Sequence, residues 1–392
     1  MSEPIFASAE GQNLKKLPLP ATHRFKSLDS IRGLAALAVL FGHISGMFIW
    51  PEKWIKWMKW PLLNMAFDGR SAVTMFFVLS GFVLAYPYVS GAGARLNVPL
   101  FYARRIIRIW LPWFCAFVLA LICRCWLFQP FATHPPANCS YWQLPVRWQE
   151  VLLQCVFLFH NGPGQILPQD WSLGIELIGS ALIPLLVILA WKPLHWLWLS
   201  LLAAVLFVIV PQESYFNSGS FYTSFILGVL LARHHGALIA KMKQLKFHHR
   251  LFVLLAGVAL YQARRIEDHF GYNEAMADQV AWVICSIGCV FIIAASLSSR
   301  RIDAFLITRP VLWVGHISYS IYLLQSMVII CFLPPLFAAL NRLGFGASPW
   351  LLPFSWVCGL TLTLALAWPF YLLVEVPSVN LGRTLSSKSK NK

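Results

Sequence analysis

Long apolar runs recur along the whole of this 392-residue chain. Each is near the ~20 residues with which an α-helix crosses ~30 Å of hydrocarbon. Charged residues make up only 12% of the sequence, against about 25% in soluble domains. The pattern therefore predicts a membrane protein and disfavours a soluble globular fold.

The placement of charge decides how many of these runs span the membrane. The apolar runs cover residues 31–50, 71–90, 106–128, 151–160, 173–191, 194–210, 221–233, 250–263, 280–298, 311–333 and 350–374. Five basic segments lie beside them, at residues 15–32, 95–108, 233–250, 300–309 and 383–392. If all five are cytoplasmic, as the positive-inside rule predicts, an even number of crossings separates each from the next.

This rule implies that one of the eleven runs does not span the membrane. An odd number of crossings would otherwise lie between Arg108 and Arg233. The run at 151–160 is the shortest, so we expect it to be re-entrant or interfacial. The sequence thus predicts an all-α polytopic transmembrane helix bundle with about ten spanning helices and both termini cytoplasmic.

A single membrane domain is expected to fill the chain. We predict a polar tail over 1–26, a membrane domain over 27–382 and a disordered basic tail over 383–392. The first 26 residues lack an apolar region, so no cleavable signal peptide is expected. The net charge of +16 lies in short loops, which leaves no basic domain for nucleic acid. The cysteines fall mostly inside apolar runs and have no metal-ligand spacing, so no metal is expected.

Arg32 and His43 lie in the first apolar run, where an ionisable side chain is costly to keep and marks a candidate site. Their offset of eleven residues puts both on one helical face, within ~20° and ~16 Å apart. We expect Arg32 at the cytoplasmic edge and His43 near mid-bilayer. One face then offers a guanidinium suited to phosphate and a base of near-neutral pKa. The alternative is a structural His with an Arg that only sets topology.

Three arginines lie near the start of a later helix. Arg104 and Arg108 share a face at i,i+4 spacing, and Arg105 is i,i+3 from Arg108. Aligned cations repel unless an anion joins them, and arginine clusters suit phosphate groups. The alternative is an interfacial anchor that binds lipid phosphates.

A polar group opens another run at the external end of the predicted bundle. Asp170 or Ser172 can cap the helix that follows, and Glu176 points into that helix about one turn further on. A carboxylate there could hydrogen-bond a hydroxylated substrate, and Trp171 could stack on a sugar ring. The alternative for Trp171 is membership of the aromatic belt at the membrane interface.

Three further features have mainly structural interpretations. Ser80 and Gly81 lie in mid-helix, where small residues allow close packing. Tyr319 belongs to a polar stripe that ends at Gln325, and Glu375 is expected to form a salt bridge at the cytoplasmic face. No nucleophile elbow, Walker loop or zinc-protease motif is present, which favours direct transfer to a substrate hydroxyl.

Together these motifs resemble the acyltransferase-3 family of integral-membrane O-acyltransferases, from Ser27 to about Gly382. The markers are Arg32 with ten residues before His43, Phe-Phe-Val-Leu-Ser-Gly-Phe, Arg105-x-x-Arg108, Trp171-Ser-Leu-x-x-Glu176, Ser318-Tyr-Ser-x-Tyr-Leu and Glu375-x-Pro377. Any one of them is weak. Their number, order and spacing make the combination specific.

The resemblance implies a ten-helix enzyme that transfers an acyl group, usually acetyl from acetyl-CoA, to a hydroxyl of a glycan or glycolipid. Acetyl-CoA would be a co-substrate, with no permanently bound cofactor. His43 would be the central catalytic residue, a general base that must be neutral, so we expect activity to fall below the His pKa.

The resemblance also divides the other candidates between two sides of the membrane. Arg32, Arg105 and Arg108 would engage the cytoplasmic donor, and Glu176 would act on the acceptor side. To these we add Arg104 for the donor and, as substrate-binding candidates, Asp170, Trp171, Ser172 and Tyr319.

The chain departs from the family pattern in two places. Many relatives carry a His where this chain has Gln325, which can hydrogen-bond but cannot titrate. Many also carry a fused extracytoplasmic domain, whereas this chain stops shortly after its last helix. We therefore expect an acceptor that is membrane-linked and reaches the bundle directly, such as an O-antigen, capsule or exopolysaccharide precursor in a bacterial inner membrane.

The main alternative class is a polytopic transporter, because polar residues along helices also line substrate paths. A transporter predicts paired inverted repeats and broken helices, and the sequence shows no such symmetry. A membrane scaffold is a weaker alternative, since it leaves the Arg32/His43 face without a purpose.

Overall fold

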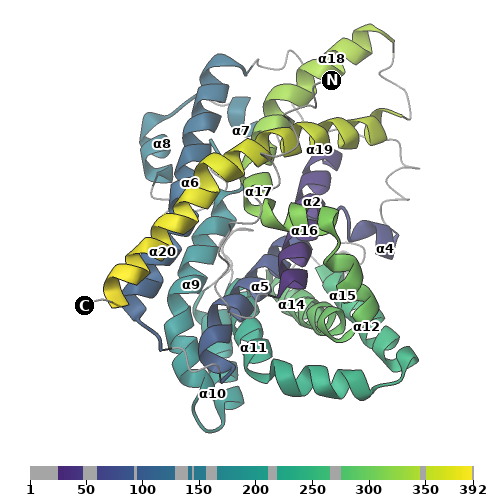
Figure 1. Ribbon diagram of the computed structural model, residues 1–392. Helices are drawn as coiled ribbons and strands as arrows, with labels where there is room; N and C mark the ends of the chain where they lie inside the picture. Colours follow the sequence, from purple (N-terminus) through teal and green to yellow (C-terminus); the bar gives the residue numbers. More distant parts are fainter. Residues whose placement is uncertain are drawn as a thin grey trace, which may run out of the picture.

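The computed structural model describes residues 25–46, 60–91, 95–128, 140–143, 145–155, 166–210, 219–264, 275–344 and 350–390. In this part of the chain every regular element is helical, which confirms the predicted all-α polytopic bundle (Figure 1). The elements are α2 (Lys26–Ser45), α4 (Pro61–Asn64), α5 (Gly69–Val89), α6 (Val98–Trp126), α7 (Ser140–Gln143), α8 (Trp148–Gln154), α9 (Asp170–Ala190), α10 (His195–Ile209), α11 (Ser220–Gln244), α12 (Phe247–Tyr261), α14 (Ala275–Ser298), α15 (Arg300–Leu306), α16 (Arg309–His316), α17 (Ser318–Met327), η4 (Val328–Phe332), α18 (Leu333–Arg342), α19 (Leu351–Phe370), η5 (Tyr371–Glu375) and α20 (Val376–Lys390).

Eight of the described helices are long and apolar enough to cross a membrane. Six are α2, α5, α6, α9, α11 and α14, and two are composite rods, Ser318–Arg342 and Leu351–Leu385. The runs predicted at 194–210 and 250–263 form α10 and α12, which have 15 residues each. These two are shorter than the ~20 residues of a usual span. The ten predicted runs are therefore all helical, eight of them at spanning length.

The first helix has a different register from the prediction. It begins at Lys26 and ends at Ser45, so Arg32 lies more than one turn inside it and His43 lies in its last turn. The early start is stabilised by contacts with α15. Ser27 hydrogen-bonds to Asp303, and Ser30 Oγ donates to the Leu306 carbonyl at 2.5 Å. The helix thus begins and ends about one turn earlier than the predicted run, and the expected depths of Arg32 and His43 in the membrane stay predictions.

Three other expectations are refined by the structure. The run at 311–333 is divided at Ile317 into α16 and α17. The last rod continues through η5 into α20, so the tail expected to be disordered from 383 is helical as far as Lys390, and α20 packs along α6 (Figure 1). In the segment 151–160, α8 ends at Gln154 after seven residues, too short to span, and residues 156–160 lie outside the described part.

Glycines let neighbouring helices approach to backbone contact. A side chain at Gly81 of α5 would meet the Phe225 carbonyl of α11 at 2.3 Å, and one at Gly228 would meet the Val78 carbonyl at 2.2 Å. A side chain at Gly33 of α2 would meet the backbone of Gly315 in α16 at 2.6 Å. Close approach of this kind is a main source of helix association in lipid, where apolar burial contributes little.

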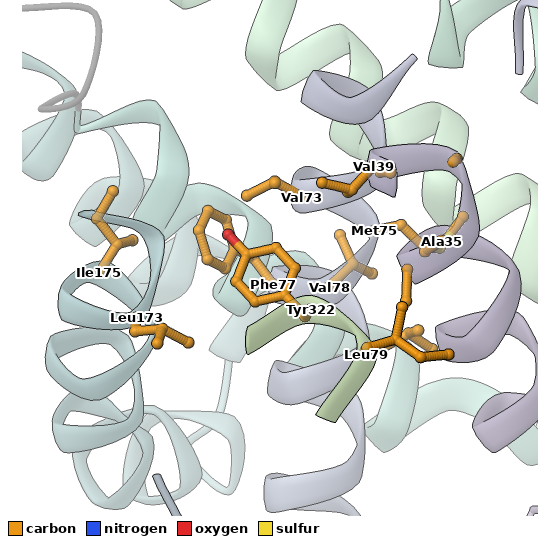
Figure 2. Close-up of a cluster of buried hydrophobic side chains, with 14 of the residues drawn as sticks. Ala35, Val39, Val73, Met75, Phe77, Val78, Leu79, Leu173, Ile175 and Tyr322 are labelled. Atoms are coloured by element: carbon orange, nitrogen blue, oxygen red, sulfur yellow. The ribbon is translucent and has the colours of Figure 1, made fainter. Parts of the chain in front are cut away.

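Buried apolar side chains of α2, α5, α9 and α17 fill the centre of the bundle. Figure 2 shows Val39, Phe77, Leu173 and the ring of Tyr322 in this core. By contrast, α10 buries only Leu199 and exposes most of its other large apolar side chains, as a lipid-facing helix does. The core therefore fixes how α2, α5, α9 and α17 lie around the polar residues described next.

Two π-helical segments interrupt the last two rods. η4 ends two residues before Pro334, and η5 ends two residues before Pro377. Proline has no N–H to donate, so the regular i→i−4 ladder is broken just before these positions. The wider turn changes the direction in which the following side chains point.

Candidate functional site

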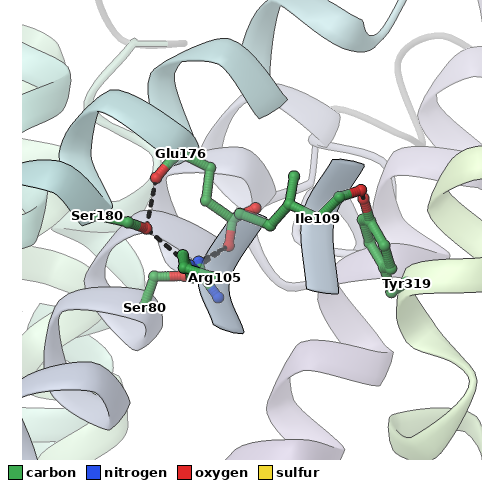
Figure 3. A network of polar contacts seen from close by, with 6 residues as sticks. All are labelled: Ser80, Arg105, Ile109, Glu176, Ser180 and Tyr319. Atoms are coloured by element: carbon green, nitrogen blue, oxygen red, sulfur yellow. Dashed lines mark hydrogen bonds and ion pairs between the residues drawn. The ribbon is translucent and has the colours of Figure 1, made fainter. Parts of the chain in front are cut away.

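An ion pair between α6 and α9 is the centre of a buried polar group. Arg105, whose residue is only 8% exposed, contacts the carboxylate of Glu176 and donates from Nε to Ser180 Oγ at 2.8 Å. Ser80 Oγ of α5 donates to Glu176 Oε1 at 3.0 Å. Figure 3 shows these side chains converging from three helices. In a low-dielectric interior such bonds hold the pair in one geometry.

Local sequence explains why Arg105 meets Glu176. Asn97 caps α6 by accepting from the Leu100 N–H at 3.1 Å, which fixes the start of the helix two turns before Arg105. One turn before Arg105, Tyr102 donates to the Ala181 carbonyl of α9 at 2.9 Å. These contacts set the position of α6 along α9.

Three more charged residues surround this ion pair. Arg32 of α2 and Arg108 of α6 interact electrostatically with each other, and Arg32 also with Arg105 and Glu176. Glu375, at the end of η5, interacts electrostatically with both Arg108 and Arg32, and η5 packs against α6. We call these five residues the arginine–carboxylate cluster. Its members come from α2, α6, α9 and η5.

Neighbouring polar groups hold this cluster in place. Asp29 lies 3.7 Å from Arg32, one turn earlier on α2. Tyr319 of α17 donates to the Ile109 carbonyl of α6 at 2.7 Å (Figure 3). Glu375 Oε2 accepts from Ser320 Oγ at 2.7 Å. The predicted substrate-binding residue Tyr319 therefore packs beside the arginines and bonds to their helix.

The structure corrects the expected separation of Glu176 from the arginines. The sequence predicted Arg105 on the cytoplasmic donor side and Glu176 on the external acceptor side, but the two side chains are in contact. Each lies about two turns from its own helix start. The helices α6 and α9 run antiparallel, since Tyr102 contacts Ala181 while Arg105, further along α6, contacts Glu176, earlier in α9. Arg104 is exposed and stands apart, beside Gly382 of α20.

His43 lies in the last turn of α2, half-buried, on the same helix as Arg32. Its side-chain hydrogen-bonding neighbour is Gln325, which is fully buried in α17. Gln325 Nε2 donates to the Tyr322 carbonyl at 3.3 Å. Gln325 Oε1 is buried and accepts no hydrogen bond at strict geometry. Gln325 can therefore orient His43 without exchanging a proton with it.

A second buried network joins α9 to α17. Ser172 Oγ and the Tyr322 hydroxyl are 2.5 Å apart, and they donate to the Gln169 carbonyl at 3.0 and 3.2 Å. The Gln169 side chain donates to the Leu323 carbonyl at 2.9 Å and accepts from Ser326. Ser172, a predicted substrate-binding residue, is thus bonded to protein groups here.

Asp170 and Trp171 also contact the protein. Asp170 is fully buried and accepts from Gln154 Nε2 at 2.7 Å. Gln169 occupies the N-cap position of α9 and makes no side-chain capping bond, so the expected capping role of Asp170 or Ser172 is wrong. Trp171 is half-buried with its ring 5.8 Å from that of Phe221. Both side chains therefore contact other protein groups, and their substrate-binding roles stay predictions.

Three polar residues of these networks were not predicted from the sequence: Ser180, Gln154 and Gln169. Ser320 and Tyr322 belong to the predicted polar stripe, which assigned them no individual role. A signal existed for Ser180, which is i+4 from Glu176 and therefore on the same helical face. For Gln154 and Gln169 the only signal is an uncharged amide beside an apolar run. Among the residues that the structure describes, no group of three or more His, Cys, Asp or Glu could hold a metal ion.

A family model described as an acyltransferase domain, that of acyltransferase 3, matches residues 25–372, nearly the whole chain. The match contains His43, Gln325 and every member of the arginine–carboxylate cluster except Glu375. No curated protein and no solved structure matched the chain.

Proposed function

Because the chain belongs to the acyltransferase 3 family of membrane acyltransferases, we propose that it moves an acyl group from acyl-CoA to a hydroxyl of a glycan or lipid-linked saccharide. Acetyl is the proposed acyl group, and His43 the proposed general base. One observation carries the proposal. Arg32, which shares a helix with His43, lies in one polar cluster with Arg105 and Arg108.

The cluster supports binding of the CoA phosphates. Guanidinium groups match phosphate oxygens in pairs and stay charged when partly buried. Arg105 already donates to Glu176 and to Ser180, so we assign it to holding the cluster together. Arg32 is half-buried and Arg108 is exposed, and these two are the proposed phosphate contacts. Glu176 then acts by fixing Arg105, in place of the acceptor-side role expected from the sequence.

The distance along α2 fits a long donor. Arg32 and His43 are separated by ~16 Å of helical rise and ~20° of rotation. A flexible pantetheine arm can extend over such a distance, so phosphates at Arg32 leave the thioester free to reach His43. Gln325 would orient the imidazole for that reaction.

The proposed chemistry is a direct transfer. The neutral imidazole of His43 takes the proton of the acceptor hydroxyl as its oxygen attacks the thioester carbonyl. The C–S bond then breaks, the acyl group stays on the acceptor oxygen, and the CoA thiolate receives the proton from His43. General-base catalysis of this kind contributes ~10²–10⁴-fold in rate.

We place the acceptor at the end of the bundle where α2 ends and α9 begins, because His43 and Trp171 lie near those helix ends. The basic segments support cytoplasmic termini, and the short loops suit the proposed bacterial inner membrane. An O-antigen, capsule or exopolysaccharide precursor on a lipid carrier suits a site reached from within the membrane.

The test is transfer of labelled acetyl from acetyl-CoA to lipid-linked saccharide in membranes that contain the His43→Ala variant. We expect at least a hundredfold loss of rate, since ~10²–10⁴ is the range for a general base. His248→Ala, an exposed residue of α12, is the matched control and should keep full activity. Near-normal transfer by the His43 variant would rule out the assigned base.

A further inference from the structure

Glu375 occupies an unusual place in the chain. It is the last residue of the π-helical segment η5, two residues before Pro377, and lies three residues beyond the end of the family match at 372. π-helical turns are rare and are often found at functional sites. Here the segment directs a carboxylate toward α17, where Glu375 Oε2 accepts from Ser320 Oγ at 2.7 Å.

The charges in this region are nearly balanced. Arg105 contacts Glu176, and Arg32 lies 3.7 Å from Asp29. The third guanidinium is Arg108, which is exposed. Glu375 lies near it, because η5 packs against α6 and because Ser320, the bonding partner of Glu375, is next to Tyr319, which donates to the Ile109 carbonyl. Glu375 interacts electrostatically with both Arg108 and Arg32. Thus Arg32 and Arg108, the two arginines that are accessible to an anion, have one half-buried carboxylate in common, that of Glu375 in η5.

A carboxylate at this point competes with a phosphate for the same two cations. Glu375 stabilises the charges of Arg32 and Arg108 when the site is empty, because like charges held close together repel. When a polyphosphate enters, the carboxylate becomes the repelling charge. We propose that Glu375 is a positioning counter-ion for Arg32 and Arg108 that sets the affinity for the phosphates of the donor and is exchanged for them. The inference rests on the proposed function, in which those phosphates are those of acyl-CoA.

Whether neutralising Glu375 strengthens or weakens polyphosphate binding distinguishes a counter-ion from a purely structural residue. Removing the charge of Glu375 should strengthen binding of a polyphosphate, because a repelling charge is lost while both arginines remain. A residue that only holds the arginines in place would instead weaken binding when replaced. Tighter product binding would also slow release of CoA, so KM and kcat should fall together in the neutral variant.

The experiment compares binding of CoA to the purified full-length protein and to Glu375→Gln in lipid nanodiscs. We expect binding to be about tenfold tighter in the variant at low salt, and the difference to shrink at high salt as the charges are screened. Glu375→Asp, which keeps the charge, should restore most of the original affinity. Asp278→Asn, which removes one negative charge at the Arg264 pair, is the matched control and should bind CoA as the unchanged protein does.

Binding by Glu375→Gln that is equal to or weaker than that of the unchanged protein would overturn the inference. Inorganic pyrophosphate serves as a second probe. If the unchanged protein binds pyrophosphate but not CoA, and Glu375→Gln binds pyrophosphate more tightly, the counter-ion role stands and the proposed donor is wrong. If neither probe binds, both are wrong. If Glu375→Gln and Glu375→Ala both fail to give a monodisperse protein, the carboxylate is structural and the inference falls.

Discussion

Replacing Glu176 with glutamine would leave Arg105 buried beside an amide that carries no charge. The guanidinium would keep its bond to Ser180, and the amide oxygen could still accept from Ser80, so the shape of the group is preserved. Removing one partner of a buried ion pair costs about 3–5 kcal/mol. The Glu176 side chain keeps 20% of its surface exposed, which puts the expected loss at the lower end, about 3 kcal/mol of unfolding free energy. Arg105→Met should cost a similar amount, because it leaves the carboxylate unpaired.

The combination of the two changes distinguishes a direct contact from two independent sites. In the double variant neither charge remains, so we expect a loss of about 3–4 kcal/mol in place of 6, a coupling of ~2–3 kcal/mol. The free energies would be measured by reversible unfolding in mixed micelles. Arg105→Met combined with Asp278→Asn is the control pair, and its effects should add. Additivity within ~0.5 kcal/mol for the Glu176 and Arg105 pair would refute the ion pair and restore the separation inferred from sequence.

Three further predictions concern other parts of the molecule. Gly81→Leu should sharply reduce the yield of monodisperse protein, since its Cβ would lie 2.3 Å from the Phe225 carbonyl. The control Gly236→Leu, whose Cβ would have nothing within 4 Å, should keep the yield, and equal yields would count against the α5–α11 packing. Tyr322→Phe should cost about 1–2 kcal/mol in the same unfolding assay, because its hydroxyl bonds to buried groups of α9; no change would contradict the network. Acyl transfer should be fully present at a pH above the pKa of His43 and be lost as pH falls through it, because a protonated imidazole cannot accept a proton; a flat profile down to about pH 5 would argue against this base.

The spacing of apolar residues and the placement of charge were sufficient to predict a membrane protein. They were also sufficient to predict that Arg32 and His43 share one face of a helix. A helix has fixed rise and rotation, so an offset of eleven residues has the same meaning wherever the helix begins. Its start was misplaced because Ser27 and Ser30, which are polar, gain partners on α15 that lie 276 residues away in the chain. Such distant partners leave no local signal.

The three arginines of α6 show most clearly the difference between what the sequence predicted and what the tertiary structure decided. Their spacing correctly indicated cations near a helix start, and the family resemblance, confirmed by the matched family model, indicated an acyltransferase. Spacing could not show that Arg105 pairs with Glu176, that Arg104 lies beside α20, or that Arg108 interacts electrostatically with Glu375. Those partners depend on how far each helix is shifted and rotated against its neighbours. That shift is set by backbone contacts at glycines such as Gly81 and by bonds such as that of Tyr102 to α9, which exist only after the helices have packed.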